Sequence, residues 1–231
     1  MRANSAVPAA VLFDMDGTLV DSEKVWTVSL HDTAAWLGGA MSQEARDAVV
    51  GSDMARTLDI LFRDLGLVPD RSRMADTAAY LTARTGELFA EGLTWRPGAR
   101  EALALVSAAG IPAALVTNTE RALTERALET IGREHFAASV CGDEVPRGKP
   151  DPDPYLRAAR LLGAAPGACL AVEDSPTGAL AAERAGVPVL VVPCDVPVPG
   201  GPGRVLRDSL VGLGLADLHD GYLQARGERA A

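Results

Sequence analysis

The clearest pattern in the chain is a series of short apolar runs rich in Val, Leu, Ile and Ala. Four runs stand out and a fifth is weaker: residues 9–13, 111–116, 169–172 and 187–192, with the weaker run at 138–141. Uninterrupted apolar runs of this length are typical of parallel strands buried on both faces. Segments with helical periodicity lie between them, at 97–109, 120–131, 152–162 and 176–185, and each ends near a glycine. This alternation predicts an α/β fold with a doubly wound, Rossmann-like parallel sheet.

One interval is too long for a simple connection, because about 75 residues follow the first run before the next strand–helix unit begins. Apolar residues at three- and four-residue spacing within it predict helices over 26–37, 43–50, 54–65 and 72–90. We therefore predict a helical cap domain at residues 22–92, inserted into a core domain formed by residues 1–21 and 93–231. After the last strand we expect a Pro/Gly-rich loop over 196–203, a covering element over 205–215 and a frayed tail over 227–231.

Composition and charge narrow the class of ligand. The 231 residues are 48% hydrophobic and 23% charged, as in an ordinary globular protein. Their 22 Lys and Arg against 31 Asp and Glu give a net charge of −9, which opposes general attraction to nucleic acid or anionic lipid. The expected partner is a small molecule, and neither nucleic acid nor a membrane is expected. An anionic substrate would need local cations, backbone N–H groups and a metal.

The cellular setting follows from features that are missing from the pattern. No apolar run approaches the ~18 residues of a membrane span, and residues 1–13 lack the apolar region and cleavage site of a secretory signal. Cys141, Cys169 and Cys194 have no metal-binding spacing and are interpreted as small buried hydrophobes. We expect a cytoplasmic protein. The pattern leaves both a monomer and a homodimer open.

The first candidate for chemistry is the pair Asp14 and Asp16, which directly follows the first predicted strand and precedes Gly17. Ligands of open α/β sheets bind at the carboxyl ends of the strands, where both side chains would lie. One carboxylate there could act as a nucleophile or metal ligand while its neighbour transfers protons. A polar turn with capping aspartates would produce the same short motif.

Two further motifs could bind an anion. Thr117 and Asn118 follow the second strand at the start of a helix, which suits phosphate binding but also helix capping. Lys149 stands between Gly148 and Pro150 in a stiff loop, which suits a cation that neutralises a transferring phosphoryl group. An ordinary turn is the alternative for Lys149.

The fourth motif is Glu173-Asp174, again at the end of a predicted strand. Adjacent carboxylates repel each other unless a cation lies between them, and with Asp14 they would make an oxygen-rich site suited to Mg²⁺. Capping of the next helix is again the alternative. All four motifs fall at the same end of the predicted sheet, however, which separate turns and caps do not explain.

These motifs resemble, in order and spacing, those of the haloacid dehalogenase-like hydrolase superfamily, and the resemblance extends over residues 9–193, including the insertion. Residues 14–23 are most similar to the branch that contains sugar-phosphate phosphatases, phosphoglycolate phosphatases and β-phosphoglucomutase. The resemblance implies a Mg²⁺-dependent phosphomonoester hydrolase that acts on a small phosphorylated metabolite, such as a sugar or polyol phosphate, through an aspartyl phosphate.

The resemblance also implies roles for the motif residues. Asp14 would attack phosphorus, and Asp16 would protonate the leaving alkoxide and then activate water. Thr117, Asn118 and Lys149 would hold the phosphoryl oxygens. Mg²⁺ would be bound by Asp14, the backbone carbonyl of Asp16, Asp174, and Glu173 either directly or through water.

Three alternative functions would each be expected to show a different pattern at the motif positions. A phosphoglucomutase-like enzyme typically carries a His ten residues after the second Asp, where this chain has Trp26. A true haloacid dehalogenase uses no metal and would not need Asp16 or the Glu173-Asp174 pair in these roles. A catalytically inactive binding protein would be expected to have lost at least one motif residue, and all are present.

Two cap residues are candidates for substrate contact. Trp26 stands where similar hexose-phosphate phosphatases also have Trp, although it would serve equally as a core residue of the first cap helix. Arg56 follows a segment, residues 51–56, that resembles the substrate loop of relatives, although a surface arginine on a helix would look the same.

Overall fold

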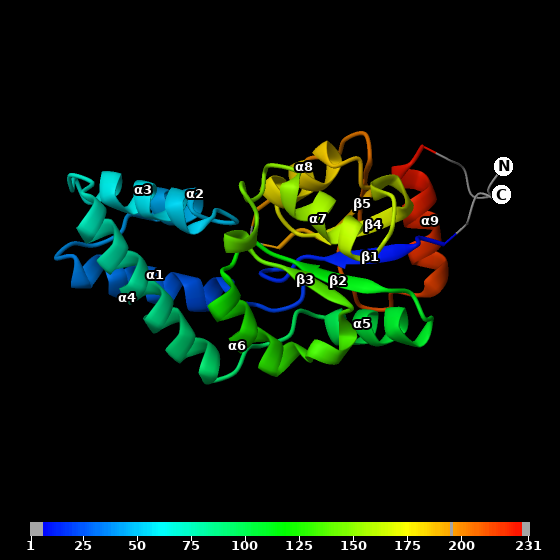
Figure 1. Cartoon of the computed structure of the whole chain (residues 1–231), viewed down its shortest axis with the longest axis horizontal. Coiled ribbons are helices and arrows are strands. Elements are labelled where there is room, and N and C mark those ends of the chain that lie inside the picture. Colours follow the sequence, from blue (N-terminus) through cyan, green and yellow to red (C-terminus); the bar gives the residue numbers. More distant parts are fainter. Residues whose placement is uncertain (1–6, 195, 228–231) are drawn as a thin grey trace.

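The computed structural model describes residues 7–194 and 196–227, with a sheet on one side of an elongated molecule and a group of helices on the other (Figure 1). In this part of the chain, six parallel strands form one sheet in the order β3-β2-β1-β4-β5-β6. They are β1 (Ala10–Phe13), β2 (Ala113–Val116), β3 (Ala138–Val140), β4 (Cys169–Glu173), β5 (Val189–Val191) and β6 (Arg204–Leu206).

Strand β1 lies at the point where the strand order changes direction. Its residue Leu12 is opposite Ala114 of β2 on one side and Ala171 of β4 on the other. From there β2 and β3 extend the sheet one way, and β4 to β6 extend it the other way. The predicted doubly wound α/β fold is therefore confirmed, and its ligand-binding edge is the one where β1, β2 and β4 end.

Helices cover both faces of the sheet, which explains the uninterrupted apolar runs. Val11 and Phe13 pack with α5 (Ala99–Ala108), α6 (Arg121–Ile131) and α9 (Leu215–Ala225), whereas Leu12 points to α7 (Asp153–Leu161) and α8 (Pro176–Arg184). Every side chain of such a strand loses its contact with water, so polar alternation would cost stability. Short 3₁₀ turns lie at Arg133–His135, Gly142–Glu144 and Pro166–Ala168.

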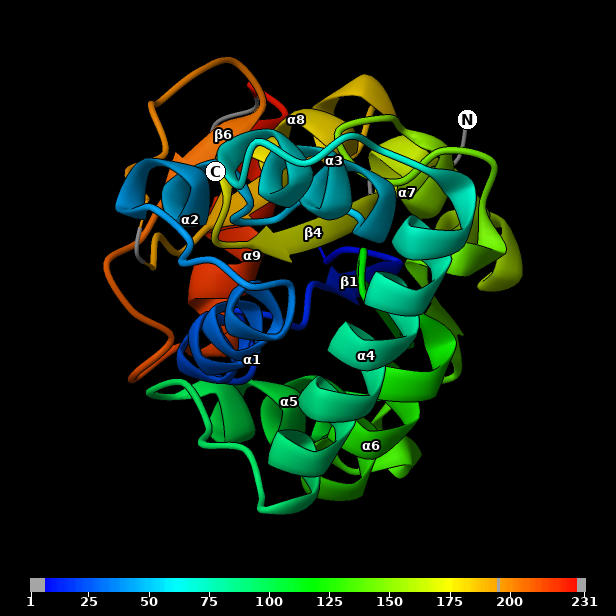
Figure 2. The ribbon, with the colours of Figure 1, turned by 90° about the vertical axis from the view of Figure 1, so that its left-hand side faces the viewer.

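The insertion after β1 forms the predicted helices, α1 (Glu23–Trp36), α2 (Gln43–Ala48), α3 (Met54–Asp64) and α4 (Arg71–Ala90). They stand beyond the carboxyl ends of the strands, as Figures 1 and 2 show. Leu30, Leu61 and Leu81 belong to a separate apolar cluster among these helices. The division at residues 22 and 92 stays a prediction, since Phe89 at the end of α4 packs into the cluster that contains Phe13.

The two segments that join the inserted helices to the sheet run side by side. The Asp21 N–H donates to the Thr94 carbonyl at 2.8 Å, and the Arg96 N–H donates to the Leu19 carbonyl at 2.9 Å. Both crossings of the chain are thus held together by backbone hydrogen bonds, close to the motif that contains Asp14.

The C-terminal part differs from the prediction. The expected covering element over 205–215 is wrong: this stretch contains the end of the edge strand β6 and a loop, and the helix α9 follows it. Leu218, Gly221, Tyr222 and Ala225 form the buried side of α9 at three- and four-residue spacing, a helical signal that the sequence does carry. Of the expected frayed tail, residues 228–231 lie outside the described residues.

The cysteines and the helices have the properties expected of a globular protein. Cys141 and Cys169 are buried and Cys194 is half-buried, and no disulfide joins any two of them. Among the helices described here, none combines the length and the apolar character that crossing a bilayer requires.

Gly98 allows a test of the fold. It has φ +79° before α5, and a Cβ there would lie 2.3 Å from the backbone of Leu210. Gly110 has φ +66° and open space around it. We expect Gly98→Ala to lower the free energy of unfolding by clearly more than the roughly 1–2 kcal/mol of left-handed strain alone, and Gly110→Ala to cost only that strain. Urea denaturation measures both, and equal losses would contradict the packing described here.

Candidate active site

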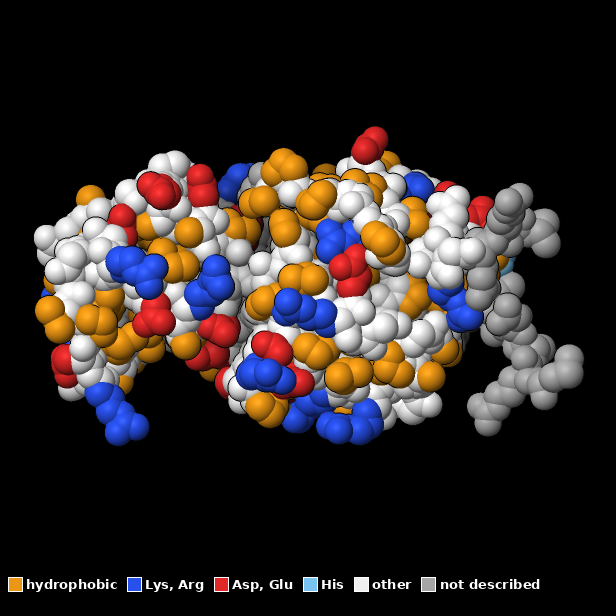
Figure 3. All heavy atoms as spheres, turned by 90° about the horizontal axis from the view of Figure 1, so that it is seen from above, with side chains coloured by type: hydrophobic (Ala, Val, Ile, Leu, Met, Phe, Trp, Pro, Cys, Tyr) orange, Lys and Arg blue, Asp and Glu red, His pale blue; other side chains and the backbone are white. Residues whose placement is uncertain are grey.

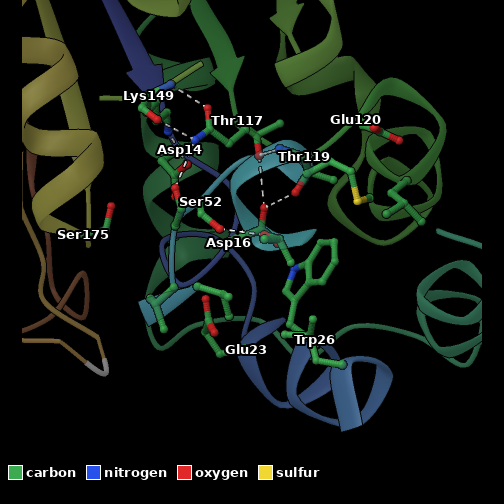
Figure 4. A pocket seen from close by; sticks show the side chains of 18 of the residues that line it. Asp14, Asp16, Glu23, Trp26, Ser52, Thr117, Thr119, Glu120, Lys149 and Ser175 are labelled. Carbon is green, nitrogen blue, oxygen red and sulfur yellow. Dashed lines mark hydrogen bonds and ion pairs between the residues drawn. The ribbon is translucent and has the colours of Figure 1, made fainter. Parts of the chain in front are cut away.

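The four motifs meet at the carboxyl edge of the sheet. Figure 4 shows Asp14, Asp16, Thr117 and Lys149 together there. Asp14 follows β1, Thr117 follows β2, and Glu173 and Asp174 stand at the end of β4, while Lys149 comes from the loop before α7. Because β1 lies between β2 and β4, residues about a hundred positions apart in sequence become neighbours.

Lys149 occupies the middle of this edge. Its Nζ lies 2.5 Å from Asp14 Oδ1, 2.6 Å from Glu173 Oε1 and 2.8 Å from the Val116 carbonyl oxygen. Burial by itself would lower the pKa of the ammonium, but the carboxylates of Asp14 and Glu173 outweigh that effect and hold the pKa above its usual range. Lys149 is therefore a permanent cation beside the predicted nucleophile.

The side chain of Asn118 fixes the backbone around Lys149. Its Oδ1 accepts from the Lys149 N–H at 2.7 Å, and its Nδ2 donates to the Lys149 carbonyl at 3.0 Å. Nδ2 also donates to the carbonyl of Gly51, in the loop between α2 and α3, at 3.0 Å. Phosphate binding by Asn118 stays a prediction, because its amide here joins the lysine loop to the inserted helices.

Three buried carboxylates gather next to Lys149. Oxygens of Asp14, Glu173 and Asp174 all lie within 4.8 Å of one another. Burial, together with the charge of Glu173, raises the pKa of Asp14 to about 7, and burial, followed by the charges of Asp14 and Glu173, raises the pKa of Asp174 well above its usual range. One ammonium does not balance three carboxylates.

This group of oxygens fits a hard divalent cation such as Mg²⁺, which prefers carboxylate ligands and would relieve the repulsion between them. Asp14 and Asp174 are the best placed to hold it. Both oxygens of Glu173 are already engaged, Oε1 by Lys149 and Tyr155 and Oε2 by Ser175, whereas Lys149 contacts only Oδ1 of Asp14. Thr18 Oγ1 donates to Asp174 at 3.4 Å. A Cβ on Gly17 would lie 2.1 Å from an Asp174 oxygen, so only glycine leaves room for this carboxylate.

Glu173 has a partner that the sequence analysis missed. The hydroxyl of Tyr155, a fully buried residue of α7, donates to Glu173 Oε1, and Ser175 Oγ lies 3.3 Å from Oε2. Burial and the charge of Glu173 raise the pKa of the Tyr155 phenol well above its usual range, so the phenol remains a donor. Tyr155 also stands on the buried face of a predicted helix, where its sequence position is that of a core residue.

Asp16 accepts two hydrogen bonds on each oxygen. Ser22 Oγ and Trp26 Nε1 donate to Oδ1 at 2.6 and 3.1 Å, and Thr117 Oγ1 and Thr119 Oγ1 donate to Oδ2 at 3.1 and 2.8 Å. These donors come both from the sheet edge and from the start of the inserted helices (Figure 4). They fix the orientation of the carboxylate next to Asp14, and the roles of Ser22 and Thr119 were not predicted.

A pocket opens between this edge and the inserted helices. Trp26 lines it as expected for a substrate contact, whereas Arg56 is exposed in the first turn of α3 and does not line it. The structure therefore does not bring Arg56 to the site. The lining residues contributed by the inserted helices and their loops are Glu23, Trp26, Leu30, Arg46, Val49, Val50, Gly51, Ser52, Met54, Thr57 and Leu81.

Residues 8–186 match the family model of the haloacid dehalogenase-like hydrolases. The chain belongs to this family. The match covers the strands β1, β2, β3 and β4 and the inserted helices, so it includes all four motifs of the site.

Curated relatives and a solved structure agree with this assignment. Hexitol phosphatase A of Escherichia coli is 36% identical over 195 residues, which are 80% of this chain and 84% of that protein. Protein CbbY of Rhodobacter capsulatus is 33% identical over 194 residues, covering 80% and 86% of the two chains. A crystal structure of a CbbY mutant from Rhodobacter sphaeroides in complex with xylulose-(1,5)-bisphosphate has a TM-score of 0.82 at 32% identity, covering 91% of this chain and 99% of that one. The predicted enzyme class, a phosphatase of this family, is confirmed at the level of the family.

The cluster of Asp14, Glu173 and Asp174 predicts that binding of Mg²⁺ stabilises the folded protein. At about 100 times its Kd, Mg²⁺ should raise the free energy of unfolding by about 2.7 kcal/mol and the Tm by roughly 5 °C or more. Asp174→Asn should abolish the rise, because it removes a ligand oxygen. Asp32→Asn, which removes a carboxylate paired with Arg84 elsewhere, should keep it. Differential scanning fluorimetry with Mg²⁺ and with EDTA measures this, and an unchanged rise in Asp174→Asn would contradict it.

A second prediction concerns Tyr155. Tyr155→Phe should lower the free energy of unfolding by about 1.5–3 kcal/mol, since a hydrogen bond to a buried charged group is lost while the ring still packs. Thr33→Val is the control, because that buried hydroxyl donates to a neutral acceptor, the Ser29 carbonyl, at 2.6 Å. It should cost about 0.5–1.5 kcal/mol. Chemical denaturation compares the two, and a smaller loss for Tyr155→Phe would show that Glu173 does not depend on the phenol.

Proposed function

We propose that this chain is a Mg²⁺-dependent phosphomonoester hydrolase that acts on a small sugar or polyol phosphate through an aspartyl phosphate on Asp14. The observation that carries the proposal is the position of Asp14. It contacts the ammonium of Lys149 and belongs to the group of three carboxylates that fits a divalent cation. The names of the relatives, one of them a hexitol phosphatase, support the substrate class.

The chemistry that these residues support has two steps. An oxygen of Asp14 attacks phosphorus while the bond to the leaving oxygen breaks, and Asp16, protonated at this stage, gives its proton to that oxygen. Asp16 then takes a proton from a water molecule that attacks the aspartyl phosphate, which releases inorganic phosphate and restores Asp14. Bound Mg²⁺, held by Asp14, Asp174 and the backbone carbonyl of Asp16, would neutralise charge on the phosphoryl group.

The surrounding residues position these groups. Lys149 supplies a cation at the phosphoryl side. The four donors Ser22, Trp26, Thr117 and Thr119 keep the carboxylate of Asp16 at the leaving-group side. The pocket between sheet and helices would hold the rest of the substrate away from bulk water. The contact of Asn118 with Gly51 fits a closed arrangement of the two parts.

We also propose that the protein works on small metabolites in the cytoplasm. Cys141, Cys169 and Cys194 form no disulfide with one another, as expected in a reducing compartment. On the face seen in Figure 3, basic and acidic side chains are interspersed rather than gathered into a basic patch. A phosphate ester would therefore be drawn by the local cations of the site and not by the general field of the protein.

The decisive test is release of phosphate from para-nitrophenyl phosphate and a panel of sugar and polyol phosphates, with and without Mg²⁺. Asp14→Asn should lower kcat by a factor on the order of 10³ or more, because the attacking carboxylate is lost. Asp32→Asn, on the surface of α1, should behave as the wild type.

The other outcomes assign other functions. Conversion of β-glucose 1-phosphate into glucose 6-phosphate without net release of phosphate would indicate a mutase. Absence of both activities with intact binding of phosphate esters would indicate an inactive binding protein. Turnover that Asp14→Asn leaves unchanged would contradict the nucleophilic role.

A further inference from the structure

A second buried ion pair lies on the side of the pocket away from the sheet. Arg46 of α2 places Nη2 2.5 Å from Glu23 Oε2 and 3.0 Å from the Glu23 carbonyl oxygen, and its Nε donates to Thr27 Oγ1 at 2.8 Å. Both charged side chains are about nine-tenths buried, with 8% and 10% exposed. Both also line the pocket that Asp14 and Asp16 share.

The pair lies where the leaving group of a phosphate ester would go. Glu23 and Trp26 come from α1 and lie across the pocket from Asp14 and Lys149, with Asp16 between them (Figure 4). The same region is lined by apolar side chains, among them Leu30, Val49 and Met54. A leaving group there would therefore meet one ion pair within a largely apolar wall.

The charges of the lining decide what kind of leaving group fits. Among the described residues that line the pocket, the cations are Lys149 and Arg46, and each already contacts a carboxylate. Glu120 adds another acid to the lining, where burial and the charge of Asp143 raise its pKa. A second phosphate or a carboxylate on the substrate would meet Arg46 only by competing with Glu23 and losing its own water.

We propose that the Glu23–Arg46 pair makes this pocket selective for phosphomonoesters with an uncharged, hydroxyl-bearing leaving group and excludes substrates with a second anionic group. Hydroxyl groups can donate to the Glu23 carboxylate and accept from the Arg46 guanidinium without breaking the pair. The inference rests on the proposed phosphatase function.

The test uses two esters that differ at one carbon, D-glucitol 6-phosphate with a terminal hydroxyl and 6-phosphogluconate with a terminal carboxylate. The wild type should have a kcat/KM at least about tenfold higher for the glucitol ester. Glu23→Gln keeps the size of the side chain and an acceptor for Arg46 but removes the charge. This variant should improve turnover of 6-phosphogluconate. The kcat/KM for D-glucitol 6-phosphate divided by that for 6-phosphogluconate should therefore fall by about tenfold or more.

Two further variants show whether the freed guanidinium is responsible. Asp32→Asn removes the same charge from the same helix and also breaks an ion pair, with Arg84 at 2.8 Å, but lies outside the pocket lining, so it should leave the ratio unchanged. In Glu23→Gln/Arg46→Gln the gain on 6-phosphogluconate should disappear. A wild-type ratio near one, an equal shift in Asp32→Asn, or a gain that persists in the double variant would overturn the proposal.

Binding measurements keep this test separate from that of the phosphatase function. Titration calorimetry of both esters into Asp14→Asn and Glu23→Gln/Asp14→Asn, with Mg²⁺ present, compares affinities without turnover. The preference for the glucitol ester in Asp14→Asn, and its loss when Glu23→Gln is added, would support the selectivity even if no ester were hydrolysed. Equal affinities for the two esters in Asp14→Asn would overturn it.

Discussion

The ammonium of Lys149 holds together the edge of the sheet where the four motifs meet. It reaches a carboxylate after β1, another at the end of β4 and the backbone carbonyl at the end of β2, all within 2.8 Å. Removing one member of such a buried group leaves the others as uncompensated charges, which is far more costly than losing a surface ion pair. The spacing of the three central strands and the position of Asp14 therefore depend on the same group of contacts.

The single positive charge of Lys149 leaves the group of three acids with an excess of negative charge. Burial raises the pKa of Asp14 and that of Asp174, and the neighbouring carboxylates raise both further. A divalent cation would offset the excess negative charge and the charge of an incoming phosphate. Tyr155 and Ser175 meanwhile keep Glu173 in place through hydrogen bonds. The repulsion among the three acids, which by itself would destabilise the fold, is therefore also what favours binding of a cation at the site.

The inserted helices and their loops contact residues of the site as well as covering it. Trp26 orients Asp16 from α1, and the loop carbonyl of Gly51 receives the amide that also fixes the lysine loop. The paired segments at Asp21 and Thr94 place both connections beside the first motif. Movement of the helices would thus change the surroundings of Asp16 and of the pocket wall together.

The sequence by itself determined the parallel sheet, the inserted helices and the four polar motifs at one edge. It could do so because strands buried on both faces must be uniformly apolar, and because polar residues at their carboxyl ends have few other uses. It could not reveal β6, a three-residue edge strand, and the signal of α9 was present but overlooked.

Only the tertiary structure decided which side chains meet. The sequence positions of Tyr155, Glu23 and Arg46 fit a core helix or a helix surface equally well, and folding alone brings them to the site. Arg56 shows the converse, since its motif suggested a contact that the direction of α3 turns toward solvent. Local pattern fixes which face of an element is buried, but the partner across a pocket depends on how separate elements pack.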